Sequence, residues 1–100
     1  MKDEHRKIMS AVSYYKTERT IDGNQQHYTK KQYDIYLYED KILAGSRHFS
    51  LEHVNDVSYR PISDAGLLYL HTNQGVFAFE VDVDPADFIK SYKKLKNSIK

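Results

Sequence analysis

Short strand-like runs, each ended by turn residues, follow one another through most of this chain. The clearest run places Ile35 and Leu37 on one face of an extended segment, and Tyr36 and Tyr38 on the other. An alternation with a period of two is typical of a half-buried strand, because successive side chains of a strand point to opposite faces. A series of such runs at spacings of about 8–12 residues predicts an all-β barrel or sandwich.

This spacing predicts about seven strands, which occupy residues 12–82. They are the runs AVSYYKTERTI, QHYTK, YDIYLYE, ILAGSR, EHVNDVSYR, LLYLHT and VFAFEV. The dipeptide Asp22–Gly23 follows the first run and predicts a tight hairpin turn, because Asp-Gly readily takes the backbone angles that such turns require. The fifth run is expected to end at Pro61, and the following residues ISDAG, 62–66, to lie in a loop.

The last part of the chain changes period. Phe88, Tyr92, Leu95 and Ile99 recur at the spacing of one stripe on an α-helix. This pattern predicts an amphipathic helix over residues 85–99. Because the helix must bury its apolar stripe, we expect it to cover the open end of the barrel. The expected fold is therefore mainly β with one C-terminal α-helix.

The 100 residues are expected to form a single domain, 1–100, because no repeat, low-complexity tract or linker divides them. Residues 1–11 are expected to be flexible or to form a short helix. The chain has no cysteine, which excludes disulfides and thiolate metal sites. The stretch MKDEHRKIMSAVSYY contains no apolar run of the signal-peptide kind, and we expect a cytoplasmic protein.

Four segments of the chain resemble a known family pattern. They are IYLYEDKIL, FSLEHVNDVSY, GLLYLHTNQGVFAFEV and DPADFIKSYKKL. Their order and apolar spacing are similar to those of bacterial pleckstrin-homology-like (PH-like) and GRAM-like domains. The resemblance implies a bent barrel of seven antiparallel strands, with a C-terminal helix that plugs one end. The sequence departs from the family around one hairpin turn, where Tyr38 and Lys41–Ile42 hold places that many bacterial members fill with threonine and arginine.

The PH-like superfold includes lipid binders, peptide binders and scaffolds, so the fold alone does not fix the function. The sequence contains neither a nucleophile-elbow motif nor a phosphate-binding glycine loop, and we expect no enzymatic activity. We expect a protein-interaction or scaffolding module, with self-association as one form of it. The expected contact surface is aromatic and consists of Tyr14, Tyr15, Tyr28, Tyr36 and Tyr38. Cross-strand pairing within the sheet accounts for these tyrosines equally well.

Binding of anionic lipid or phosphoinositide at the membrane surface is the alternative function that the resemblance implies. In lipid-binding PH domains, basic residues on the first two strands ring the open end of the barrel. The matching positions here are Lys16 and Arg19 on the first strand and Lys30 and Lys31 on the second. A phosphate site needs several cations that converge, and Lys16 and Arg19 are an odd number of residues apart. An ordinary charged strand surface explains these four bases as well.

Three aspartates, Asp82, Asp84 and Asp87, lie around Pro85 and have two explanations. A calcium loop of the EF-hand type needs ligands and a glycine at fixed positions, and several of these positions hold the wrong residues here. A helix start accounts for the segment better. Asp84 then caps the helix, Pro85 takes the first helical position, and Asp87 lies near the positive end of the helix. We expect the cap and no metal site.

Two further kinds of ligand have little support in the sequence. His48, His53 and Glu52 are zinc-ligand types, but the two histidines would point to opposite faces of a strand, and nothing fixes a further ligand. The net charge of +1 argues against a nucleic-acid partner, because affinity for a polyanion depends on neutralising its phosphates. We expect no cofactor and no nucleic acid.

Overall fold

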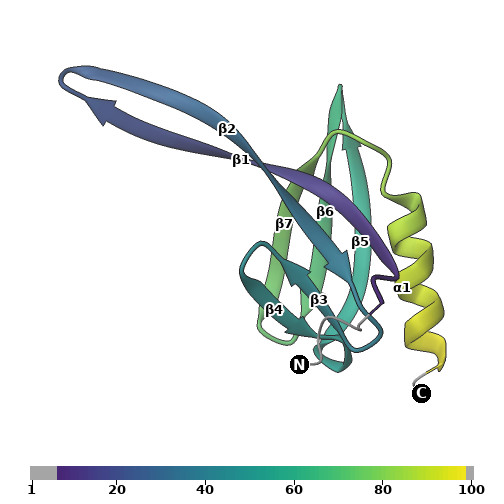
Figure 1. Cartoon of the computed structure of the whole chain (residues 1–100). Helices are drawn as coiled ribbons and strands as arrows, with labels where there is room; N and C mark the ends of the chain where they lie inside the picture. The colour runs from purple at the N-terminus through teal and green to yellow at the C-terminus, as the bar shows by residue number, and fades with distance from the viewer. Residues whose placement is uncertain (1–6, 99–100) are drawn as a thin grey trace.

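The computed structural model describes residues 7–98, which form seven antiparallel strands in one sheet, a short 3-10 helix and one α-helix (Figure 1). The strands are β1 (Ser10–Asp22), β2 (Gln25–Leu37), β3 (Lys41–Ala44), β4 (Arg47–Ser50), β5 (Val54–Ile62), β6 (Ala65–Thr72) and β7 (Gly75–Val81). The 3-10 helix η2 spans Leu51–His53, and α1 spans Ala86–Ser98. The strand order is β4-β3-β2-β1-β7-β6-β5, so the sheet bends into an open barrel that does not close. The predicted mainly-β fold with a C-terminal helix is confirmed.

The core lies on the inner face of the bent sheet. Ile35 and Leu37 are fully buried there, whereas Tyr36 between them is half-buried on the outer face, as the alternation predicts. Val12 and Tyr14 of β1 point to the same inner side. Since each strand contributes alternate apolar residues to one cluster, the sheet and the helix enclose a single core.

Helix α1 packs its apolar stripe against β1 and β5. Phe88 and Tyr92 are only 1% and 2% exposed. The Tyr92 hydroxyl donates a hydrogen bond of 2.7 Å to the carbonyl oxygen of Val54, which ties the helix to β5. Burial, together with the nearby carboxylate of Asp56, raises the pKa of Tyr92 to about 12. Ile99, the last residue of the predicted stripe, lies outside the described residues.

The start of α1 confirms the helix-cap explanation of the aspartates. The Asp84 carboxylate accepts a hydrogen bond of 3.0 Å from the backbone N–H of Ala86. The carbonyl of Pro85 accepts the N–H of Ile89, the first bond of the helical ladder. Asp87 lies in the first turn, where its negative charge favours the positive end of the helix.

Two strand assignments from the sequence are wrong, and their errors cancel in the count. QHYTK and YDIYLYE, predicted as two strands, form one continuous strand, β2. ILAGSR, predicted as one strand, is split into β3 and β4 by a turn at Gly45 and Ser46. Gly45 has a φ of 63°, and a Cβ there would lie 2.8 Å from the Tyr14 hydroxyl, so this position favours glycine over any other residue.

Other predicted boundaries also differ. η2 takes the first residues of the fifth predicted strand, and β6 begins at Ala65, inside the predicted loop. β5 continues through Pro61 to Ile62. A proline is tolerated there because β5 is an edge strand, and no strand on its outer edge needs the N–H group that proline lacks. At the N-terminus, β1 begins at Ser10 and residues 7–9 are not helical, so a short helix does not reach them. The rest of that predicted segment, residues 1–6, lies outside the described part. Within residues 7–98, no helix is long and apolar enough to span a membrane.

The first hairpin extends well beyond the rest of the sheet. β1 and β2 pair along their whole length, from Ser10 and Leu37 to Asp22 and Gln25. β7 pairs with β1 only at Tyr15, and β3 pairs with β2 only over its last three residues. Residues 16–31, here called the arm, therefore project as a two-stranded ribbon from the rest of the molecule, here called the body (Figure 1). The radius of gyration of 15.3 Å exceeds the value of about 13 Å typical of a compact chain of this length.

Candidate functional site

The pairing register defines two faces of the arm. Residues directly opposite each other in the ladder point to the same side, so Arg19 shares a face with its partner Tyr28, and with Ile21 and Lys30. We call this the outer face, because it continues the outer face of the sheet. Ile21 and Tyr28 are 64% and 66% exposed, among the highest values for large hydrophobic side chains in residues 7–98. The outer face of the arm therefore presents two uncovered apolar side chains beside two cations.

The four predicted basic residues do not converge. Lys16 and Lys31 lie directly opposite each other on one face of the ribbon, whereas Arg19 and Lys30 lie on the other. Lys31 forms an ion pair of 3.4 Å with Glu18 on its own face. This arrangement does not form a single phosphate site from all four bases.

Lys30 is held at the junction of the arm and the body. Its Nζ lies 3.0 Å from the carboxylate of Glu80 on β7 and 5.3 Å from the centre of the Tyr15 ring. A hydrogen bond from the Tyr15 hydroxyl to Asp82 raises the pKa of Tyr15. These contacts join β2, β1 and β7 and stabilise the base of the arm, where it meets the body.

The five predicted tyrosines are not one patch. Tyr14 is 8% exposed, stacks on Tyr33 and meets the edge of Phe79, so it belongs to the core and not to an exposed aromatic patch. Tyr15 and Tyr36 lie on the outer face at the base of the arm. The Tyr38 ring lies next to the Tyr36 ring, with the ring centres 6.5 Å apart. Tyr28 lies midway along the arm, opposite Arg19.

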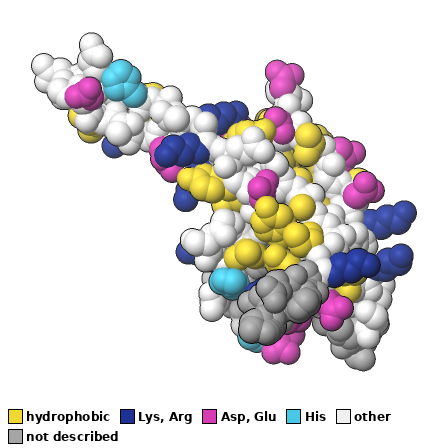
Figure 2. All heavy atoms as spheres, in the orientation of Figure 1, with side chains coloured by type: hydrophobic (Ala, Val, Ile, Leu, Met, Phe, Trp, Pro, Cys, Tyr) yellow, Lys and Arg dark blue, Asp and Glu magenta, His cyan; other side chains and the backbone are white. Residues whose placement is uncertain are grey.

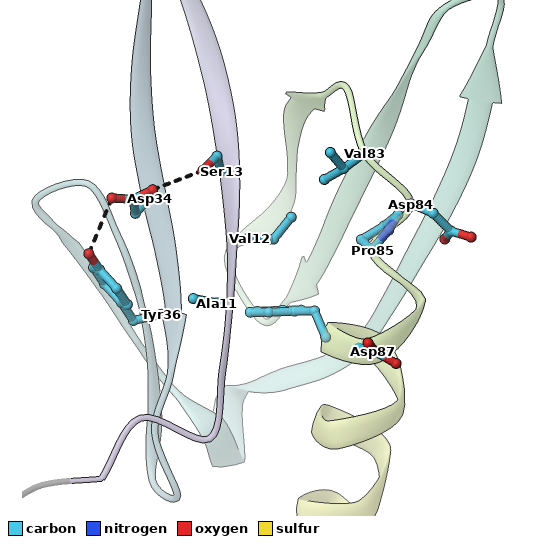
Figure 3. Close-up of a pocket in the computed structure, with 10 residues that line it drawn as sticks. Ala11, Val12, Ser13, Asp34, Tyr36, Val83, Asp84, Pro85 and Asp87 are labelled. Atoms are coloured by element: carbon cyan, nitrogen blue, oxygen red, sulfur yellow. Dashed lines mark hydrogen bonds between the residues drawn. The ribbon is translucent and has the colours of Figure 1, made fainter.

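A groove of about 420 Å³ opens beside the base of the arm, between the two strands and the start of α1 (Figure 3). It is lined by Ala11, Val12, Ser13, Asp34, Tyr36, Val83, Asp84, Pro85, Asp87 and Phe88. Asp34 accepts hydrogen bonds from the hydroxyls of Ser13 at 3.0 Å and Tyr36 at 3.2 Å. The bond to Asp34 raises the pKa of Tyr36.

Three aspartates line the groove, and Asp34 is the one that comes from the sheet. Asp84 and Asp87 lie on the helix wall, but Figure 3 shows their carboxylates pointing away from the strands. Asp84 also caps the helix. Val83, which is 54% exposed, adds an apolar surface to the helix side of the groove. The groove can therefore accept an apolar side chain together with a cation placed near Asp34.

A second cavity of about 520 Å³ lies at the junction of arm and body, between β1 and the turn that joins β3 to β4. Its lining includes the aromatic rings of Tyr33 and Phe77 and the cations Lys16 and Arg47. The Arg47 guanidinium lies 4.9 Å from the centre of the Phe77 ring. Sequence reasoning identified Lys16 but missed Arg47, because only the fold brings β4 next to β7.

The zinc-ligand types do not form a site. His48 lies on β4 and His53 on η2, both exposed, and His53 is 3.6 Å from Glu52. Within residues 7–98, no group of three or more histidine or acidic side chains is arranged to hold a metal ion. His48 and His53 are therefore separate surface residues.

No protein-family model matches this chain, and the search of curated proteins gives no match either. The resemblance to PH-like domains therefore stays a prediction. The arm, the groove and the cavity are the features of the molecule that bear on its function.

Proposed function

We propose that this chain is a non-catalytic interaction module, in which a PH-like body holds the arm out as a protein-binding element. The observation that carries this proposal is the exposure of the arm. From Lys16 to Lys31, every residue is exposed except Glu18, which is half-buried. The cysteine-free composition fits a reducing compartment, and we place the module in the cytoplasm.

Both edges of the arm support a role in binding. Residues 16–22 of β1 and 25–31 of β2 pair with each other and with no further strand in the described part of the chain. Such edges present backbone N–H and C=O groups that can pair with another chain. A two-stranded hairpin is at best marginally stable by itself in water, so a long exposed arm gains most from a partner.

A photo-crosslinking amino acid at Ile21 tests this proposal in cells that make the protein. Val76 on β7 is the matched control, because it is 58% exposed and lies on the body. We expect protein adducts from position 21 and few from position 76. Adducts from neither position, or equal yields from both, would contradict a protein-binding role for the arm.

The cavity with Lys16 and Arg47 supports a second candidate function, the binding of an anionic headgroup. Two cations next to aromatic rings can hold a phosphate by charge-assisted hydrogen bonds. Sedimentation with vesicles that contain anionic lipid tests it. Binding that falls with salt and is lost in Lys16→Ala/Arg47→Ala supports this function. Binding that survives this double substitution, or no binding, contradicts it.

A further inference from the structure

We propose that the partner of the arm is a second copy of this chain. Two copies associate about a two-fold axis, with each arm lying antiparallel across the groove at the base of the other. This inference rests on the proposed protein-binding role of the arm and names its partner.

The outer face of the arm combines a cation with apolar side chains. Arg19, Ile21 and Tyr28 share the outer face. Arg19 has no carboxylate partner among the residues that the structure describes. A surface of this kind fits a site that offers both a carboxylate and an apolar hollow.

The base of the arm offers both features on the same face. Asp34 accepts two hydroxyl donors but forms no ion pair within residues 7–98. Beside it, the groove is lined by apolar groups that include Ala11 and Val83. Figure 2 shows hydrophobic side chains gathered on the body, whereas the projecting arm carries scattered side chains of both charges and a histidine. The cation of Arg19 on the arm is complementary to the carboxylate of Asp34 beside the groove.

The register of the β1–β2 ladder allows both copies to form the contact between Arg19 and Asp34 at the same time. In a two-fold contact, residue i of one copy meets residue j of the other, and j meets i. Arg19 lies three residues beyond Lys16, and Ser13, the ladder partner of Asp34, lies three residues before it. An axis at the level of Lys16 therefore places each Arg19 at the level of the other copy's Asp34.

The same axis also satisfies the apolar contact. Ile21 lies five residues beyond Lys16, and Ala11, at the edge of the groove, lies five residues before it. A single register thus joins each Arg19 to an Asp34 and brings each Ile21 to a groove. This coincidence is the strongest argument for a second copy over an unrelated protein.

Charge repulsion at the axis is small in this arrangement. Lys16 and Lys31 are at the level of the axis, but they point to the face of the ribbon opposite to Arg19. On the contact face, the nearest cation is Lys30, and the carboxylate of Glu80 neutralises it at 3.0 Å. The two copies can therefore approach through uncharged or paired groups near the axis.

Sedimentation velocity over a range of protein concentrations tests this proposal with a charge exchange. We expect a concentration-dependent dimer of the 11.8 kDa wild-type chain. Arg19→Asp and Asp34→Arg should each weaken association by at least about tenfold, because close charge pairs at interfaces are strongly coupled. The double variant Arg19→Asp/Asp34→Arg should regain most of the affinity, because it restores the pair with its signs reversed.

Arg60→Asp is the matched control, because Arg60 is an exposed arginine on β5, far from β1 in the strand order. It should leave the dimer unchanged, and circular dichroism should show that every variant is folded. A wild-type chain that stays monomeric at all concentrations overturns the second-copy proposal, as does a double variant as weak as the single ones. In either case, crosslinks from position 21 to a different protein would still support a protein-binding role for the arm. The absence of any crosslink would contradict both the protein-binding role and the second-copy proposal.

Discussion

The two halves of the first hairpin differ sharply although the same two strands form them. Near the body, β1 and β2 bury alternate residues such as Val12, Ile35 and Leu37 under the helix and the opposite strands. In the arm, the same ladder continues with full backbone pairing, but its side chains are exposed. Backbone pairing alone therefore does not distinguish a structural region from a contact region. The burial of side chains does.

This difference divides stability and binding between the two regions. A fully buried large apolar side chain contributes about 1.5–3 kcal/mol, and the described part of the arm contains none. Changes in the body should therefore alter the free energy of unfolding, and changes in the arm should alter association. The stability measurements below apply at protein concentrations low enough for the wild type to be monomeric, because association adds apparent stability.

Phe88→Ala should have the largest effect. The ring is almost fully buried under the sheet, and its removal leaves a cavity that costs about 3–5 kcal/mol. Urea denaturation measures this loss. Ile21→Ala in the arm is the control, with an expected change within about 0.5 kcal/mol. Equal losses at the two positions would remove the distinction between body and arm.

The free energy of unfolding should depend on pH through the ionisation of the Tyr92 hydroxyl. Its folded pKa of about 12 lies above the ordinary value of 10, so the folded state holds this proton more tightly than the unfolded state. The associated stability is fully present below pH 10 and is lost as the pH rises to about 12, by about 2–3 kcal/mol.

Tyr92→Phe isolates this contribution. At neutral pH the variant should be about 1–3 kcal/mol less stable, because the Val54 carbonyl loses its hydroxyl donor. Chemical denaturation at a series of pH values should then show the gap between wild type and variant closing between pH 10 and 12. A gap that stays constant over this range would contradict the buried, hydrogen-bonded state of Tyr92.

Gly66→Ala should destabilise the body by about 1–3 kcal/mol through overpacking. A Cβ at this position would clash with the Tyr59 ring, which covers the glycine from the neighbouring strand. Thermal denaturation measures the loss. In a Tyr59→Ala background the same substitution should cost much less, and an unchanged cost would show that the ring is not the cause.

Shortening the arm should have the smallest effect on stability. Tyr15 and Gln32 are ladder partners, so an Asn-Gly turn that joins them replaces residues 16–31 without disturbing the register. We expect the free energy of unfolding to change by no more than about 1 kcal/mol. Sedimentation should show association to be lost. A shortened chain that unfolds, or one that still dimerises, would contradict the division between the regions.

Much of the fold could be predicted from local patterns. The alternation around Ile35 and Leu37 and the stripe of Phe88 and Tyr92 are consequences of burial on one face, and the structure buries these residues. The errors arose where tertiary context decides. Pro61 is tolerated because β5 is an edge strand, and a single sequence does not show which strands are edges.

The candidate site was harder to predict, because distant segments form it. The groove joins β1 and β2 to the chain around Val83, and only the fold brings them together. The length of the arm depends on where β3 and β7 stop pairing, which its own residues do not encode. The burial of Tyr14 was within reach, since it shares the strand face of Val12.

Hydrogen–deuterium exchange at two protein concentrations tests the central distinction most directly. At low concentration, the amides of residues 16–31 should exchange far faster than those of β5, β6 and β7, because no packed core holds the arm closed. At high concentration, the arm amides should become protected while the body stays unchanged. Arm amides as strongly protected as the body at low concentration, or unaffected by concentration, would contradict an arm that is stabilised by a second copy.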